Sequence, residues 1–88
     1  MITDKQGDAA TEEIECWANK IIRLVDPEAQ ASVYYDAESS TYVLRLARGS
    51  RVLLFRLSAA QVQTAEREEE CEKVLKRKLN DLRTERIR

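Results

Sequence analysis

The sequence predicts an α+β domain in which a helix, a three-stranded antiparallel meander and a long C-terminal helix follow one another. Apolar residues recur every three or four positions before Asp26 and alternate between residues 32 and 57, and no glycine or proline follows Ser58. The 88 residues suit a single domain with a thin core. We expect this domain to span residues 10–88, with residues 83–88 the part most open to fraying.

The first helix is expected from about Ala10 to Asp26. Its apolar side chains form one face, which collects Ile14, Trp17, Ala18, Ile21, Ile22 and Val25. Thr11 or Asp8 is expected to cap its start, and Pro27 ends it because a residue before proline disfavours the α conformation. Residues 1–9 are polar and without periodicity, which predicts a flexible lead-in.

Three strands are expected next, at residues 32–36, 41–47 and 51–57. The first is rich in β-branched and aromatic side chains, and the second alternates between apolar and polar residues. Residues 37–40 predict a turn, and Gly49-Ser50 predicts a tight two-residue hairpin turn.

The tight turn at Gly49-Ser50 predicts a register for the second and third strands. It places Leu46 opposite Leu53 and Leu44 opposite Phe55, and a shift by one residue would break this match. One sheet face then collects the large apolar side chains, namely Val33, Tyr35, Tyr42, Leu44, Leu46, Leu53, Phe55 and Leu57. The first helix has to cover this face. The residues expected to be nearly free of solvent are Trp17, Ile21, Leu44 and Phe55.

Ser58 and Gln61 form a capping-box pattern, which predicts the start of one helix of about 25 residues. Such a helix is about 37 Å long, whereas a strand of six or seven residues spans roughly 20–24 Å. The last turns are therefore expected to overhang the sheet. These turns would leave three leucines exposed to water unless a second chain covers them, namely Leu75, Leu79 and Leu82.

Composition argues against catalysis and against a metal or cofactor site. The net charge is −1, histidine is absent, and neither glycine lies in a phosphate-binding loop. The acids of the last helix are interpreted as a solvated helix face, because calcium loops interleave their ligands with glycine and turn residues; they are Glu66, Glu68, Glu69, Glu70 and Glu72. An enzyme is therefore not expected, and no cofactor is implied.

Cys16 and Cys71 are the two cysteines, and they do not form a CxxC motif. Buried free cysteine is common, so both are interpreted as core residues rather than as a disulfide or a reactive thiol. The chain shows no signal-type apolar segment and no membrane span, which predicts a cytoplasmic location.

The second sheet face mixes apolar and cationic side chains. By the same register it carries Tyr34, Val43, Arg45, Ala47, Val52, Leu54 and Arg56. A fully solvated face is normally more polar, so the last helix or a second subunit is expected to cover it. The favoured function is that of a small non-enzymatic protein-interaction module that acts as a homodimer. An unidentified protein partner is also compatible with this function. The expected interface comprises Leu75, Leu79, Leu82, Tyr34 and Leu54.

The alternative function is nucleic-acid binding. Residues 58–72 hold five acids and one base, whereas residues 73–88 hold seven bases and two acids. Bases at a helix C-terminus are also favoured by the helix dipole alone, which explains part of this asymmetry. The candidate contacts for a phosphate backbone are Arg45, Arg56, Lys76, Arg77, Arg83 and Arg86.

Overall fold

Helix α1 (Asp8–Val25) begins the fold in the computed structural model, which describes residues 1–83. Its buried side chains recur four positions apart and form one apolar face, Ala10, Ile14, Ala18 and Ile22. Gly7 precedes the helix with a φ of 62°, a left-handed conformation that glycine adopts without a side-chain clash. The helix therefore begins at a glycine turn, and neither Thr11 nor Asp8 caps it through its side chain.

Residues 1–7 lie against the domain, which differs from the lead-in expected over residues 1–9. The backbone N–H of Ile2 donates to the carbonyl of Val62 at 2.9 Å, and the N–H of Gly7 donates to a tyrosine hydroxyl on the sheet at 2.9 Å. Periodicity could not reveal this segment, because single residues make its contacts with elements that are distant in the sequence.

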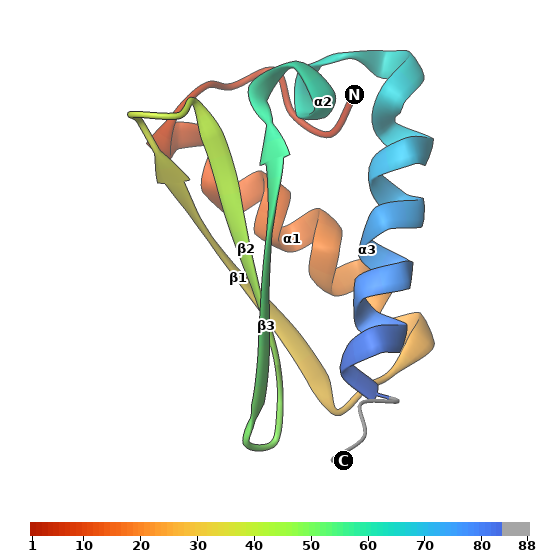
Figure 1. Cartoon of the computed structure of the whole chain (residues 1–88). Coiled ribbons are helices and arrows are strands. Elements are labelled where there is room, and N and C mark those ends of the chain that lie inside the picture. The colour runs from red at the N-terminus through yellow and green to blue at the C-terminus, as the bar shows by residue number, and fades with distance from the viewer. Residues whose placement is uncertain (84–88) are drawn as a thin grey trace.

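Strands β1 (Ala29–Asp36), β2 (Thr41–Arg48) and β3 (Arg51–Ser58) form one antiparallel sheet in the order β1-β2-β3. Figure 1 shows β2 between its two neighbours, so β1 and β3 are both edge strands. The element order and fold class predicted from the sequence are confirmed, and each strand extends the predicted range by one to three residues.

The predicted hairpin register is confirmed. Leu46 lies opposite Leu53 and Leu44 lies opposite Phe55, with the turn at residues 49–50. On β1 the pairing continues this pattern across the sheet, so the large apolar side chains share one face. Alternation along each strand therefore sends one set of side chains to the core and the other set to the opposite face.

The C-terminal segment does not form the single helix of about 25 residues that the sequence predicts. It is divided into α2 (Ala59–Gln63), the 3₁₀ turn η1 (Ala65–Arg67) and α3 (Glu68–Arg83). Thr64 interrupts the helix with an extended backbone, φ −100° and ψ 122°. The break falls where the expected helix face loses its apolar character, and it turns α3 back along the sheet so that its apolar residues reach the core.

The capping box that begins α2 is confirmed. The Ser58 hydroxyl accepts from the backbone N–H of Gln61 at 3.1 Å, and the Gln61 side-chain oxygen accepts from the N–H of Ser58 at 2.8 Å. Both bonds satisfy backbone donors that a helix start leaves without partners.

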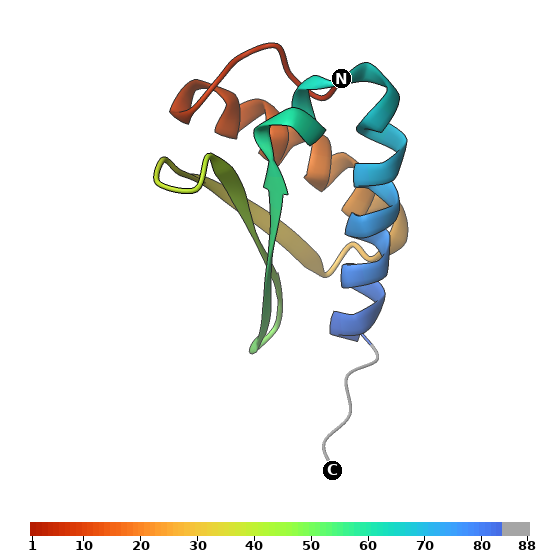
Figure 2. The same cartoon turned by 45° about the horizontal axis from the view of Figure 1, so that its top comes forward.

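Helices α1 and α3 cover the same face of the sheet, as Figures 1 and 2 both show. Of the four side chains expected in the core, Leu44 and Phe55 are buried. Trp17 and Ile21 are only half-buried at the border of the core, which corrects the prediction that they are nearly solvent-free. On α1 the core is formed instead by the buried residues that recur every four positions from Ala10, because α3 packs against that side of the helix.

Charged side chains form a cluster at the end of the molecule near the β2–β3 turn. The guanidinium of Arg48 bonds the buried carboxylate of Asp26 at 2.6 Å, and Arg83 approaches the same carboxylate at 3.5 Å. Burial raises the pKa of Asp26, but the N–H of Glu28 and the Arg48 guanidinium lower it more, so this pKa lies below its ordinary value. The cluster connects the end of α1 with β2 and with the end of α3.

Arg51 caps the last turn of α3 from the start of β3. Its guanidinium donates to the carbonyl oxygens of Leu82 at 3.1 Å and Arg83 at 3.4 Å. A cation near the last carbonyls of a helix complements the helix dipole. This contact fixes the C-terminal end of α3 against the β2–β3 hairpin.

Candidate interaction surface

The face of the sheet opposite the helices, which we call the open face, has no helix over it in Figures 1 and 2. The register places on it the residues expected there, namely Tyr34, Val43, Arg45, Ala47, Val52, Leu54 and Arg56. The α3 helix could have covered this face but lies on the other one. The open face is therefore the face of the sheet that no other described element covers.

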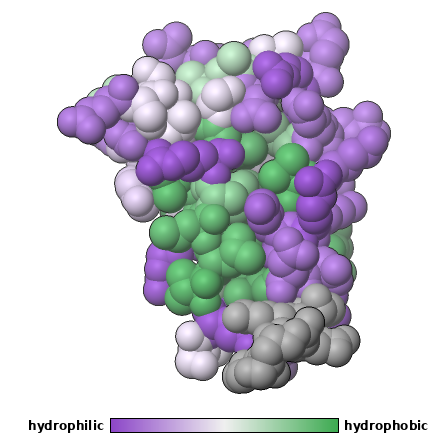
Figure 3. Space-filling model, viewed as in Figure 1, coloured by the Kyte–Doolittle hydropathy of each residue, from purple (hydrophilic) through white to green (hydrophobic). Residues whose placement is uncertain are grey.

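Three large apolar side chains of the open face are about half exposed. The exposed fractions are 54% for Tyr34, 48% for Val52 and 56% for Leu54. Val43, at the centre of the face, is buried beneath its neighbours with 2% exposed. Figure 3 shows hydrophobic residues gathered over the middle and lower part of β3, with hydrophilic residues along α3.

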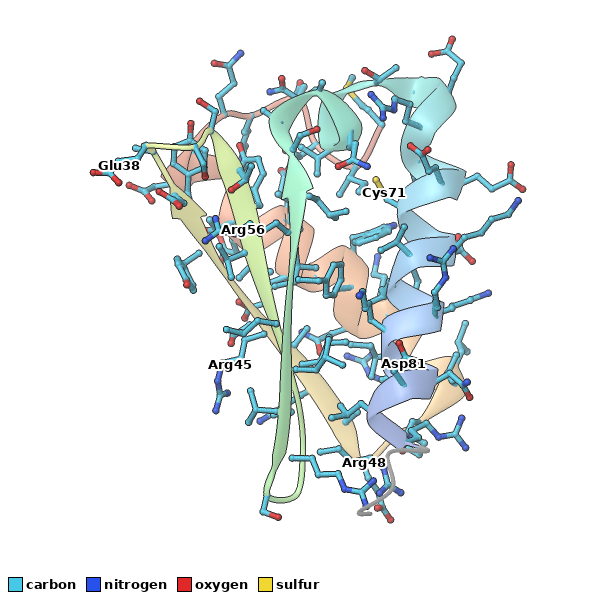
Figure 4. All side chains as sticks on the ribbon, in the orientation of Figure 1. Glu38, Arg45, Arg48, Arg56, Cys71 and Asp81 are labelled. Atoms are coloured by element: carbon cyan, nitrogen blue, oxygen red, sulfur yellow. The ribbon has the colours of Figure 1, made fainter. Side chains whose placement is uncertain are left out.

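The two arginines of the open face differ in their partners, and Figure 4 shows Arg45 pointing away from the helices. Arg56 bonds the carboxylate of Asp36 at 2.9 Å and the hydroxyl of Thr41 at 2.9 Å. The Arg56 guanidinium and the hydroxyl of Ser39 hold the pKa of Asp36 below its ordinary value. Arg45 has no hydrogen-bond or ion-pair partner within residues 1–83. The charge of Arg56 is therefore locally neutralised, whereas that of Arg45 is available to a ligand.

The leucines expected at a dimer interface lie inside the monomer. Leu75 and Leu79 have exposed fractions of 0%, and Leu82 has 1%. The overhang that motivated their assignment is absent because the helix breaks at Thr64, and the 16 residues of α3 match the sheet in length. They therefore belong to the core and offer no contact surface, which corrects the prediction for this part of the interface.

The basic residues proposed for a nucleic-acid contact do not share one surface. Arg45 and Arg56 lie on the open face, whereas Lys76, Arg77 and Arg83 lie on α3, in the other layer. Lys76 also pairs with a glutamate one helical turn away at 3.0 Å. Arg86 lies outside the described residues. No continuous basic stripe runs over the part of the chain that the structure describes.

Side chains from α1 protect the middle of the outer edge of β1, a contact that the sequence pattern does not predict. The side-chain amide of Asn19 accepts from the N–H of Ala31 at 2.9 Å and donates to its carbonyl at 3.1 Å. The Glu15 carboxylate accepts from the N–H of Val33 at 3.1 Å. In the sequence Glu15 and Asn19 are four residues apart and flank the apolar face of α1, as polar residues of any amphipathic helix do, so their spacing alone does not reveal this role. These two polar residues occupy three outward backbone groups at the middle of β1, namely the N–H and C=O of Ala31 and the N–H of Val33.

The outer edge of β3 has no such protection. In an antiparallel ladder, alternate residues direct both backbone groups away from the neighbouring strand. On β3 these are Val52, Leu54, Arg56 and Ser58, because the residues flanking the two-residue turn bond each other. Ser58 donates its N–H to the capping box, and the other three have no partner beyond the sheet within residues 1–83. We call the backbone groups of Val52, Leu54 and Arg56 the free edge.

The two thiols differ in exposure. Cys16 is exposed on α1, which corrects its interpretation as a core residue, whereas Cys71 is buried on α3. Burial, followed by the negative charge of Glu70, raises the pKa of the Cys71 thiol. Its sulfur lies 3.6 Å from the carbonyl oxygen of Gln61, to which it donates. Both cysteines are free thiols.

Two other surface features are weaker candidates for a site. A hollow beside the β1 edge is lined in part by Glu15 and Asn19, whose polar atoms already bond the strand. A second hollow lies between Ile2 and the exposed side of α1 near Cys16 and Trp17. Within residues 1–83, no group of three or more acidic or cysteine side chains is arranged to hold a metal ion.

The chain matches no protein-family model, no curated protein and no solved structure. Among the helices within residues 1–83, none combines the length and the apolar character needed to cross a membrane. The open face and the free edge are the features of the described residues that can indicate a function.

Proposed function

We propose that this protein is a small non-enzymatic interaction module that works as a homodimer. The observation that carries the proposal is the uncovered sheet face, on which Tyr34, Val52 and Leu54 are each about half exposed. Clustered exposed apolar side chains favour association, because covering them removes apolar surface from water.

The size of the chain supports association as well. A domain of 88 residues buries a smaller share of its surface than a larger one, so each additional buried side chain is a large part of its stability. A cytoplasmic location fits the proposal, because Cys16 and Cys71 are both free thiols.

The test compares two exposed leucines in different places. The parent is expected to run as a dimer of the 10.2 kDa chain in light scattering at tens of micromolar. Leu54→Glu places a charge on the open face and should give a monomer. Leu24→Glu is the matched control, since Leu24 is 89% exposed on α1, away from that face, and this variant should stay dimeric. A parent that is monomeric up to several hundred micromolar would refute the proposal.

Nucleic-acid binding is the second candidate, and one observation favours it. Arg45 carries a charge without a partner within residues 1–83, and Tyr34 is its diagonal neighbour on the adjacent strand. An arginine beside an exposed tyrosine can bind a phosphate and stack on a base. Retention on heparin that falls with salt in the parent, and is lost in Arg45→Ala but kept in Arg77→Ala, would support this candidate.

A further inference from the structure

We infer that the free edge of β3 pairs with the free edge of a second copy, which joins the two sheets into one of six strands. This inference rests on the proposed homodimer and specifies how its two chains meet. Proteins normally protect edge strands, since unpaired N–H and C=O groups form a template for another strand. Here Asn19 and Glu15 occupy outward groups of Ala31 and Val33 at the middle of β1, whereas the outward backbone groups of three β3 residues stay unpartnered within residues 1–83.

The free edge is complementary to itself in one antiparallel register. Placing Leu54 opposite the Leu54 of the second copy sets Val52 opposite Arg56 on both sides of the twofold axis. This register pairs every backbone group of the free edge. A shift by two residues in either direction leaves one of the three residues of each copy without a partner from the free edge of the other.

Side chains on both faces of the sheet fit the same register. On the open face the two Leu54 side chains meet at the axis, and each is 56% exposed in the monomer. On the helix side Leu53, which is half-buried at the edge of the core, falls opposite Phe55 of the second copy. Arg56 stays with its own Asp36 at 2.9 Å and faces no second guanidinium, so like charges are not opposed.

The ladder alone is too narrow for a tight dimer. The eight residues of β3 span about 27 Å at ~3.4 Å per residue. A stable interface needs about 600–1,000 Å² from each partner. The contacts of Leu53, Leu54 and Val52 therefore have to supply the rest, and we expect a dissociation constant in the micromolar range.

A second copy is favoured over an unrelated extended peptide for two reasons. The register above satisfies the requirement of a twofold interface that one surface complements itself. The exposed side chains along the free edge are also mainly apolar and include no acid, so the edge itself selects no charged peptide. The pairing leaves both open faces on one side, where they form a single surface across six strands.

The decisive experiment introduces opposite charges at the twofold axis. Leu54→Lys and Leu54→Glu each place like charges opposite each other, and each should weaken the dimer more than about 30-fold, the effect of losing a central interface contact. An equimolar mixture of the two variants should recover a heterodimer, because a lysine of one chain then faces a glutamate of the other across the axis. Sedimentation equilibrium measures all three samples, and circular dichroism checks that each variant is folded.

Two further variants separate this inference from the general proposal. Tyr34→Glu changes the open face on β1, two strands away from the free edge, and should leave the dimer intact. Val52→Pro removes an outward N–H that no β2 residue uses, and should weaken the dimer without a comparable loss of fold. If Tyr34→Glu dissociates the dimer and the mixture of the two Leu54 variants shows no recovery, the edge pairing is wrong and the open face holds the dimer. A parent that is monomeric throughout overturns both.

Discussion

Asn19 on α1 bonds both backbone groups of Ala31 on β1, with its amide acting as donor and acceptor at 3.1 Å and 2.9 Å. The side chain thereby takes the place of a neighbouring strand. Replacing it with leucine keeps its approximate volume but leaves the N–H and C=O of Ala31 unpaired. The free energy of unfolding should fall by about 1–3 kcal/mol, the usual cost of such unpaired groups.

Urea denaturation measures this effect, and hydrogen exchange at the Ala31 amide should accelerate in parallel. Lys20→Ala is the control, because Lys20 is the next residue on α1 and is exposed. Its free energy of unfolding should stay within about 0.5 kcal/mol of the parent value. An Asn19→Leu protein as stable as Lys20→Ala would show that this amide does not hold the edge.

Two leucines in the helices differ completely in their surroundings. Leu79 has an exposed fraction of 0% on α3, and Leu24 has 89% on α1. Leu79→Ala should lower the free energy of unfolding by about 2–5 kcal/mol, since it removes buried methyl groups and leaves a cavity. Leu24→Ala should change it by less than about 0.5 kcal/mol. Similar thermal melting of both variants would contradict the placement of α3 over the sheet.

Acid should destabilise the fold through three carboxyl groups. Hydrogen bonds from Thr3 and Lys5 lower the pKa of Glu13, and the pKa values of Asp26 and Asp36 are also lowered in the folded state. A carboxyl whose pKa is lower in the folded than in the unfolded chain stabilises the fold above its ordinary pKa. The stabilisation should therefore be lost as pH falls below the ordinary values of 4.5 for Glu13 and 3.8 for the aspartates.

Urea midpoints measured between pH 7 and pH 2 test this prediction. Asp26→Asn should lower stability at neutral pH, because Arg48 and Arg83 lose their carboxylate partner. The same variant should show a smaller further loss below pH 4 than the parent, since one titrating group is gone. An acid dependence identical to that of the parent would mean that the Asp26 cluster contributes nothing to it.

The two thiols should react in separate steps. Cys16 is exposed, so it should react with an aromatic disulfide reagent in the native protein, whereas burial and a raised pKa should protect Cys71. One thiol per chain is therefore expected under native conditions at pH 8 and two in denaturant. Cys16→Ser should abolish the native reaction and leave the reaction in denaturant at one thiol. Rapid reaction of that variant under native conditions would show that the core around Cys71 opens.

The sheet was the part of the fold most open to sequence reasoning. A two-residue turn at Gly49-Ser50 and strict alternation leave one register that pairs large apolar residues, so Leu44 opposite Phe55 followed from local rules. The path of the last helix did not follow from such rules. Its break at Thr64 depends on how much apolar surface α3 buries once it turns back, and this is a property of the folded whole.

The residues of the open face could likewise be predicted from the sequence, but the exposure of this face could not. Alternation placed Tyr34 and Leu54 on it, while only the position of α3 decides that it stays uncovered. The protection of β1 was missed because Glu15 and Asn19 resemble any polar residues at the flank of an amphipathic helix. Their role depends on the spacing between helix and strand, which no local pattern encodes.

The unequal protection of the two sheet edges limits the size of any assembly built by strand pairing. A sheet with two free edges can add subunits without end and form a filament, whereas a sheet with one can join only one neighbour. Asn19 and Glu15 occupy the middle of the β1 edge, so a pair of chains joined through β3 presents at each end an edge whose central backbone groups are already bonded. Growth beyond two subunits is then disfavoured, and loss of the Asn19 amide would make it easier.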